Sequence, residues 1–291
     1  MAKDQDILNV QLIFRSVKNS ANYFPPIVSL SESLNVLVGG DKTGTKQVDG
    51  YILKAFAAAS VEMWQRAVHS FLISASLTDA SPIWSSVAGY YSSHYTMRAL
   101  AHSLGYFQLH TKKVIVHLDL STGGYHCDIV KKNGDSREHR LYWSLVRQNK
   151  YFANDPFFYE NIDSVPPPGT TEFKSDGGHR NRANYGDLVG GFPVFRPLDE
   201  SSLRRRVEAI SGMLLSDVPI PNVYEYPDLD SVQLLAYHRI VKYRAFLDQA
   251  LSATNRFWTA QREPSWTPKY FDFQIVGADY SQLLASLMSS N

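Results

Sequence analysis

The chain has 291 residues, and its shares of 44% hydrophobic and 13% aromatic residues exclude a disordered protein and indicate a packed globular one. With 29 basic and 28 acidic residues, it has no overall charge that attracts nucleic acid or a membrane, so any RNA site must be a local basic patch. The single cysteine, Cys127, excludes an internal disulfide. Since neither a signal peptide nor a membrane-spanning stretch is recognisable, we expect a cytoplasmic protein with no membrane partner.

Residues 1–47 form an N-terminal extension that is hard to interpret. Apolar residues alternate with polar ones at Leu8, Val10, Leu12 and Phe14, which predicts a strand. The glycine-rich segment 39–46 has the composition of a loop and superficially resembles a phosphate-binding loop. It lacks the final Gly-Lys-Ser/Thr, so no nucleotide site is predicted there.

Two long helices are expected next. Apolar residues between 48 and 76 recur at three- and four-residue spacing, as on the buried face of a helix. Ser81 is a suitable N-cap and Pro82 a suitable first residue for a second helix, which runs to about Leu104 with Gly105 as its C-cap. A short connection between two long helices predicts an antiparallel helical hairpin.

A β-hairpin is expected at about 113–131, followed by a helix at 136–149. With Gly123-Gly124 as the turn, Leu120 pairs with Cys127 and Leu118 with Ile129, and these residues form one apolar face. The opposite face carries four possible metal ligands, with the two aspartates directly opposite each other: His117, Asp119, His126 and Asp128. Two imidazoles and two carboxylates can bind a transition metal, so a metal-dependent nuclease centred on the hairpin is one alternative.

The last third of the chain is expected to be helical. Apolar stripes indicate helices at about 203–214 and at 236–251, the latter ending near Thr259, and a short terminal helix at 280–288. We assign residues 217–291 to a C-terminal helical extension that packs on the same core.

Two segments carry a family resemblance. Tyr90-Tyr91-Ser92-Ser93-His94-Tyr95 leads through Arg98-Ala99-Leu100 to Gly105, and 180–186 reads Arg-Asn-Arg-Ala-Asn-Tyr-Gly. Together they resemble the two anchor segments of the HEPN superfamily of helical nucleotide- and RNA-binding domains. The resemblance implies a mainly α fold, with a HEPN-like four-helix bundle at 48–216 that contains the β-hairpin insertion. It also implies a homodimer that binds RNA or nucleotide in a bacterial toxin–antitoxin or anti-phage system.

The same segments supply the candidate site. Tyr91, Tyr95, Arg98 and His102 share one face of the second helix because they are spaced by four, three and four residues. If the protein is a metal-independent endoribonuclease, with no cofactor, we expect His102 to move the proton and arginine to stabilise the phosphorane charge. The predicted catalytic residues are Arg98, His102 and Arg180. The predicted RNA-binding residues are Tyr91, Tyr95, His179, Arg182 and Tyr185.

The competing hypothesis is a non-catalytic interaction module that binds a protein partner from the same system. It is favoured because the Arg-to-His spacing of the ribonuclease members of the superfamily is absent here. The clustering of arginine and histidine on the two anchor segments favours the nuclease instead.

Overall fold

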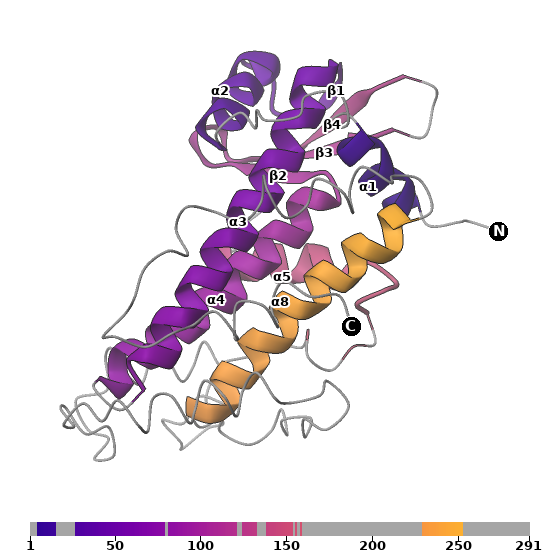
Figure 1. Ribbon diagram of the computed structural model, residues 1–291. Helices are drawn as coiled ribbons and strands as arrows, with labels where there is room; N and C mark the ends of the chain where they lie inside the picture. Colours follow the sequence, from indigo (N-terminus) through magenta and orange to yellow (C-terminus); the bar gives the residue numbers. More distant parts are fainter. Residues whose placement is uncertain are drawn as a thin grey trace, which may run out of the picture. The chain divides into compact units, whose positions relative to one another are not determined.

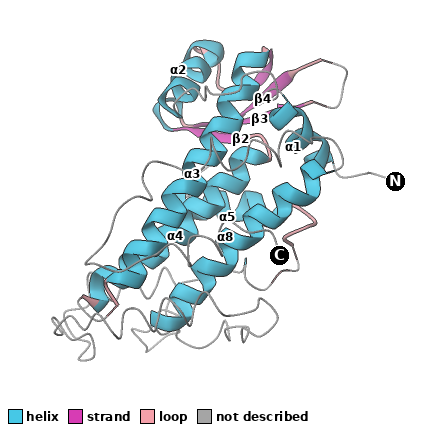
Figure 2. Ribbon diagram, viewed as in Figure 1, coloured by secondary structure: helices cyan, strands magenta, loops and turns pink. Residues whose placement is uncertain are grey.

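The computed structural model describes residues 5–15, 27–78, 81–120, 124–132, 138–153, 155, 158 and 229–252. These residues are mainly helical and include one small antiparallel sheet (Figures 1 and 2). The chain divides into two compact units. Unit 1 comprises Met1–Gln65, Met97–Ala153 and Tyr243–Pro268, and unit 2 comprises Arg66–Thr96, Asn154–Lys242 and Lys269–Asn291.

The described helices and strands follow in chain order. The helices are α1 (Gln5–Arg15), α2 (Ile27–Val38), α3 (Gly50–Ser76), α4 (Pro82–Ser103), the 3-10 helix η1 (His110–Lys112), α5 (Glu138–Gln148) and α8 (Leu229–Ser252). The strands are β1 (Gly44–Gln47), β2 (Tyr106–Leu109), β3 (Val114–Asp119) and β4 (His126–Lys131). No described helix combines the length and the apolar character needed to cross a membrane.

The sheet belongs to unit 1 and has the strand order β1-β4-β3-β2, with every neighbouring pair antiparallel. Alternate residues of β3 are fully buried, including Val114, Val116 and Leu118, and they form its core face. Phe107 of β2 lies on this face and meets Phe56 of α3 edge-on, with ring centroids 6.4 Å apart. The first part of α3 therefore packs on the core face of the sheet.

The hairpin prediction is correct in its strands and faces but wrong in its register. Leu118 pairs with Cys127, whereas the sequence interpretation paired Leu118 with Ile129. The chain connects Asp119 to His126 through a longer segment than a two-residue turn, and this shifts the pairing by two positions. A shift of two residues keeps every side chain on its face but changes its partner.

Two predictions for the N-terminal extension are wrong. The segment expected to form a strand is helix α1, in which Val10, Ile13 and Phe14 are buried at helical spacing while Leu8 is 40% exposed. The segment 39–46, expected to be a loop, ends in strand β1, which pairs with β4 at the edge of the sheet. The alternation in α1 was misleading because it fits a short helical stripe equally well.

The helical part of unit 2 is stabilised by a buried polar network. Gln233 of α8 is 1% exposed, and its Nε2 donates to Thr78 Oγ1 at 2.7 Å, to Ser85 Oγ at 3.1 Å and to the Ser74 carbonyl at 3.1 Å. The space beside Gly89 of α4 in the same region is small, since an added Cβ would lie 3.0 Å from Ser74 Oγ. Small and polar residues thus allow α3, α4 and α8 to approach closely in this unit.

The structure confirms the two long helices, α3 and α4, and the helix favoured at 136–149, which is α5. The stripe at 236–251 lies in α8. The helices expected at 203–214 and 280–288 lie outside the described residues, as does any continuation of α8 towards Thr259. The sheet is larger than the predicted hairpin because β1 and β2 extend it on both sides.

Candidate functional site

In unit 2, the predicted RNA-binding tyrosines lie on one face of α4. Tyr91 and Tyr95 are both half-buried, and their ring centroids are 6.0 Å apart. Tyr90 and His94 occupy a more buried face, where they are 2% and 3% exposed and their rings stack in parallel. The helix therefore presents Tyr91 and Tyr95 at its surface.

In unit 1, the predicted catalytic pair lies at the C-terminal end of the same helix. The Arg98 guanidinium lies over the ring of Tyr142, 5.5 Å from its centroid, and the side chain is half-buried. His102 is fully buried, stacks on Phe107 and meets the ring of Tyr142 edge-on. Arg98 and His102 thus contact the same tyrosine, and His102 is enclosed by aromatic rings.

The protonation of His102 follows from its hydrogen bond. Its Nδ1 lies 2.9 Å from the carbonyl oxygen of Tyr106, and because a carbonyl only accepts, Nδ1 carries the proton. The other ring nitrogen, Nε2, is buried and has no hydrogen-bond partner among the described residues. Burial, reinforced by the positive charge of Arg98, lowers the pKa of His102 to about 3. A general base needs a pKa near the working pH and access to its substrate, so the catalytic role of His102 stays a prediction that this environment disfavours.

We expect the burial of His102 to make stability depend on pH. Its pKa lies below the ordinary value of 6.5, so the unfolded state binds the proton more readily and stability is lost as the pH falls from about 6.5 towards 3. Between pH 7 and pH 5, the free energy of unfolding of the wild type should fall by about 2 kcal/mol more than that of His102→Gln. Urea denaturation at the two pH values measures this difference. His238, whose pKa burial lowers to about 4, is present in both proteins and cancels. If the free energy of unfolding depends on pH identically in the wild type and in His102→Gln, the lowered pKa of His102 is contradicted.

The remaining predicted site residues are on the second anchor segment. His179, Arg180, Arg182 and Tyr185 lie outside the described residues. The juxtaposition of Arg98 with Arg180, on which the nuclease hypothesis depends, therefore stays a prediction.

The four possible metal ligands on the hairpin have different partners from those expected. His117 pairs with Asp128, and Asp119 pairs with His126, so each carboxylate faces an imidazole instead of the other carboxylate. Asp128 also accepts a hydrogen bond from Thr45 Oγ1 at 2.8 Å. Within the described parts of the chain, no group of three or more His, Cys, Asp or Glu side chains is arranged to hold a metal ion. The two aspartates, whose expected repulsion suggested a cation at this face, are therefore not directly opposite each other but two residues out of register.

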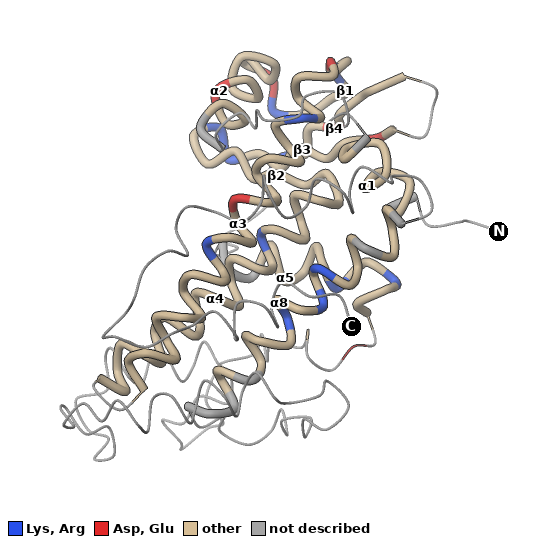
Figure 3. The backbone as a smooth tube through the Cα atoms, viewed as in Figure 1, with Lys and Arg blue, Asp and Glu red and all other residues tan. Residues whose placement is uncertain are grey.

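The described residues do contain a local basic patch, on the sheet of unit 1. Lys112 and Lys113 precede β3, while Lys131 is the last residue of β4 and Lys132 follows it. Val114 pairs with Lys131, and the Lys132 backbone N–H donates to the Lys113 carbonyl at 3.0 Å. The four lysines thus meet at one end of the β3–β4 hairpin, opposite the connection between these strands, and we call them the lysine cluster. Figure 3 marks lysine and arginine positions in blue near α2 and the strands.

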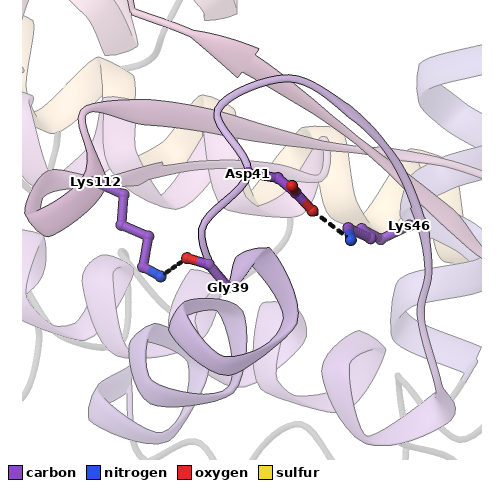
Figure 4. A network of polar contacts seen from close by, with 4 residues as sticks. All are labelled: Gly39, Asp41, Lys46 and Lys112. Atoms are coloured by element: carbon purple, nitrogen blue, oxygen red, sulfur yellow. Dashed lines mark hydrogen bonds and ion pairs between the residues drawn. The ribbon is translucent and has the colours of Figure 1, made fainter.

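The loop after α2 borders the lysine cluster. Lys112 Nζ donates to the Gly39 carbonyl, while Asp41 forms an ion pair with Lys46 (Figure 4). The hydrogen bond and charge of Lys46, with a smaller effect from Lys112, lower the pKa of Asp41. Asp41 is thus already paired with a lysine outside the cluster. Lys113 and Lys131 are exposed, so their charges face solvent.

The backbone of Lys113 is a second unusual feature of the cluster. Lys113 has φ of 54°, and among the described non-glycine residues it alone has a positive φ. A side chain in this left-handed region costs about 1–2 kcal/mol relative to the ordinary helical region. Such strain often marks a position at which a particular side chain has a functional role.

Sequence reasoning missed the lysine cluster, although the sequence carries a signal for it. Two Lys-Lys doublets, 112–113 and 131–132, flank the predicted hairpin. An antiparallel hairpin brings the start of its first strand beside the end of its second, so the doublets had to be neighbours. No protein-family model, curated protein or solved structure matches this chain, so the HEPN relationship rests on the quoted motifs alone.

Proposed function

We propose that this protein binds RNA through the lysine cluster of unit 1 and that His102 of the same unit does not cleave it. The observation that carries the proposal is the convergence of Lys112, Lys113, Lys131 and Lys132 at one end of the sheet in a chain whose net charge is only +1. Lysine ammonium groups bind phosphate oxygens, and the release of condensed counterions supplies the free energy.

Among the described residues, three carboxylates on the sheet and on the loop after α2 have partners other than the lysine cluster. Asp128 accepts from Thr45, Asp41 pairs with Lys46, and Asp119 lies at the far end of β3 opposite His126. Because these described carboxylates do not neutralise the four ammonium groups, we expect the cluster to have a positive potential that attracts a phosphate backbone.

A non-catalytic role for His102 follows from its environment. The ring is enclosed by Phe107 and Tyr142, and its low pKa keeps it neutral at physiological pH. A neutral ring enclosed in this way is disfavoured as the general acid that protonates a leaving 5′-oxygen in RNA cleavage. Its described role is structural, joining the end of α4 to β2 through Tyr106.

The experiment that tests this function measures RNA binding and RNA integrity together. Binding of a fluorescent RNA is followed by anisotropy at 50 mM and 200 mM salt, and the RNA is then examined on a gel with and without EDTA. Four phosphate contacts to a single strand predict affinity about 50-fold weaker at the higher salt, with intact RNA. No binding at 50 mM salt would contradict the proposal. Cleavage that survives EDTA and is lost in His102→Ala would instead support the ribonuclease.

A second candidate is a protein-binding module, and one observation in unit 2 favours it. Trp84 of α4 is 61% exposed and precedes Tyr91 by seven residues, so the two lie on the same helix face. Exposed tryptophan and tyrosine are enriched at protein interfaces. Absence of RNA binding, together with capture of a protein partner that Trp84→Ser abolishes, would support this function.

A further inference from the structure

The outer face of the sheet, opposite the core face, lies directly beside the lysine cluster. The strand pairings place Tyr106, His117, Asp128 and Thr45 in one row across the four strands. The next row towards the lysine cluster contains Gln108 of β2, Ile115 of β3 and Val130 of β4, and Gln108 is buried. Two aromatic rings and the apolar side chains of Ile115 and Val130 thus lie on this face near the positive charges.

The two aromatic rings in this row form a flat stack. Tyr106 and His117 have ring centroids 4.0 Å apart and an interplanar angle of 10°, and both side chains are half-buried. Val130 is 52% exposed. The face therefore offers a partly accessible ring stack and an exposed apolar side chain.

We propose that this outer face binds the unpaired bases of single-stranded RNA, whose phosphates lie on the lysine cluster. The inference rests on the proposed function and specifies its substrate class. Proteins that bind single strands combine a positive backbone track with aromatic rings on which bases stack. The bases of a duplex are hidden in its own stack, so a duplex presents only its phosphates to the lysines.

The dimensions of the face suit a short single strand. Asp128, the partner of His117, lies four residues before Lys132, so strand alternation places both on the outer face, about 13 Å apart at ~3.3 Å per residue. That distance corresponds to about four stacked nucleotides at ~3.4 Å each. One strand can therefore contact the rings and the lysines at the same time.

Asp128 gives the face a polar acceptor in the same row. Its carboxylate is oriented by the hydrogen bond from Thr45, and carboxylates accept hydrogen bonds from the exocyclic amino groups of bases. An acidic residue on a phosphate-binding surface is unfavourable unless it contacts a base. Its position among the rings, away from the lysines, agrees with a base-binding role.

The test compares a single-stranded 12-nucleotide RNA rich in adenine and cytosine, whose bases carry exocyclic amino groups, with a blunt duplex of the same length by fluorescence anisotropy. We expect Tyr106→Leu combined with Val130→Asn to weaken single-strand binding at least about tenfold while leaving duplex binding unchanged. The matched control makes the same substitutions at two other exposed positions of unit 1, Tyr125→Leu with Val36→Asn, which are 42% and 83% exposed. Its single-strand affinity should change less than about twofold. Thermal unfolding checks that each variant is folded, and Val130→Asn alone replaces the double variant if Tyr106→Leu lowers the unfolding temperature.

The outcomes separate the two proposals. If the wild type binds neither RNA, the proposed function fails and this inference fails with it. If the wild type binds duplex and single strand equally and the double variant binds as the wild type does, the lysine cluster remains an RNA site but the base-binding face is wrong. A selective loss of single-strand binding in the double variant supports the inference.

Discussion

Reversing two charges in the lysine cluster should weaken RNA binding by about 100-fold, because each substitution removes a phosphate contact and adds a repulsion. The variant is Lys113→Glu combined with Lys131→Glu, chosen because both side chains are exposed and their loss should not disturb the core. The dissociation constant is measured by fluorescence anisotropy at 50 mM salt. The variant should also show a weaker dependence of affinity on salt, since fewer counterions are released.

The control variant must change the net charge of the protein by the same amount. Arg66→Glu combined with Lys150→Glu reverses two exposed basic residues that lie outside the lysine cluster. We expect its affinity for RNA to fall no more than about threefold, the effect of overall charge alone. Equal losses in the two double variants would show that net charge, and not the lysine cluster, determines binding.

Among the glycines that the structure describes in unit 1, Gly105 is the one whose replacement by alanine should cost the most stability. Gly105 has φ of 88°, and an added Cβ would lie 2.9 Å from Leu118 Cβ. Its carbonyl also accepts from the Leu118 backbone N–H at 3.0 Å, so the backbone cannot easily move away. Left-handed strain and overpacking together should lower the free energy of unfolding by about 2–4 kcal/mol.

Urea denaturation of Gly105→Ala and Gly40→Ala measures this effect. An added Cβ at Gly40 has no neighbouring atom within 4 Å, so that variant should have nearly the stability of the wild type. A Gly105→Ala protein as stable as Gly40→Ala would show that the junction between α4 and β2 is not packed as described. Because Gly105 leads directly into the strand that carries Tyr106, this result would also weaken the description of the sheet.

The helices of this protein could be predicted from sequence because their signals are local. Ser81, Pro82 and Gly105 mark the bounds of α4, and the apolar stripe of α3 is long enough to exclude a strand. In contrast, α1 is short, and Val10 and Phe14 fit both a helical stripe and a strand alternation. The helical spacing of the apolar residues in α1 becomes evident only from which side chains are buried, and that depends on tertiary packing.

The sheet illustrates why a candidate site is harder to predict than a fold. Strand β1 has no apolar alternation, since its residues are mostly exposed at an edge, and it is defined by pairing with a segment far along the chain. The register of the hairpin depends on the length of its connection. The sequence predicted Asp119 opposite Asp128, whereas the observed register, shifted by two residues, places Asp119 opposite His126. The face of the hairpin on which each side chain lies was predicted correctly. The metal site suggested for the outer face depended on which residues are paired across the strands, and that pairing was wrong.

The α4 residues show the same limit for catalysis. Helical spacing predicted one shared face for Tyr91, Tyr95 and Arg98, and each of these side chains is half-buried. The same spacing placed His102 with them, yet the structure buries it completely because Phe107 and Tyr142 enclose its ring. Residues from β2 and α5 decide its exposure, and no pattern within α4 contains that information.

We propose that RNA lies on the outer face of the sheet and on the lysine cluster at one end of β3 and β4. Ultraviolet crosslinking of the wild-type protein to a uridine-rich single-stranded RNA, followed by proteolysis and mass spectrometry, tests it most directly. We expect crosslinked peptides from residues 106–132 in the wild type. The signal at Tyr106 should be lost in the double variant Lys113→Glu with Lys131→Glu. Crosslinks confined to residues 84–102 or 179–185, or an unchanged pattern in the double variant, would contradict it.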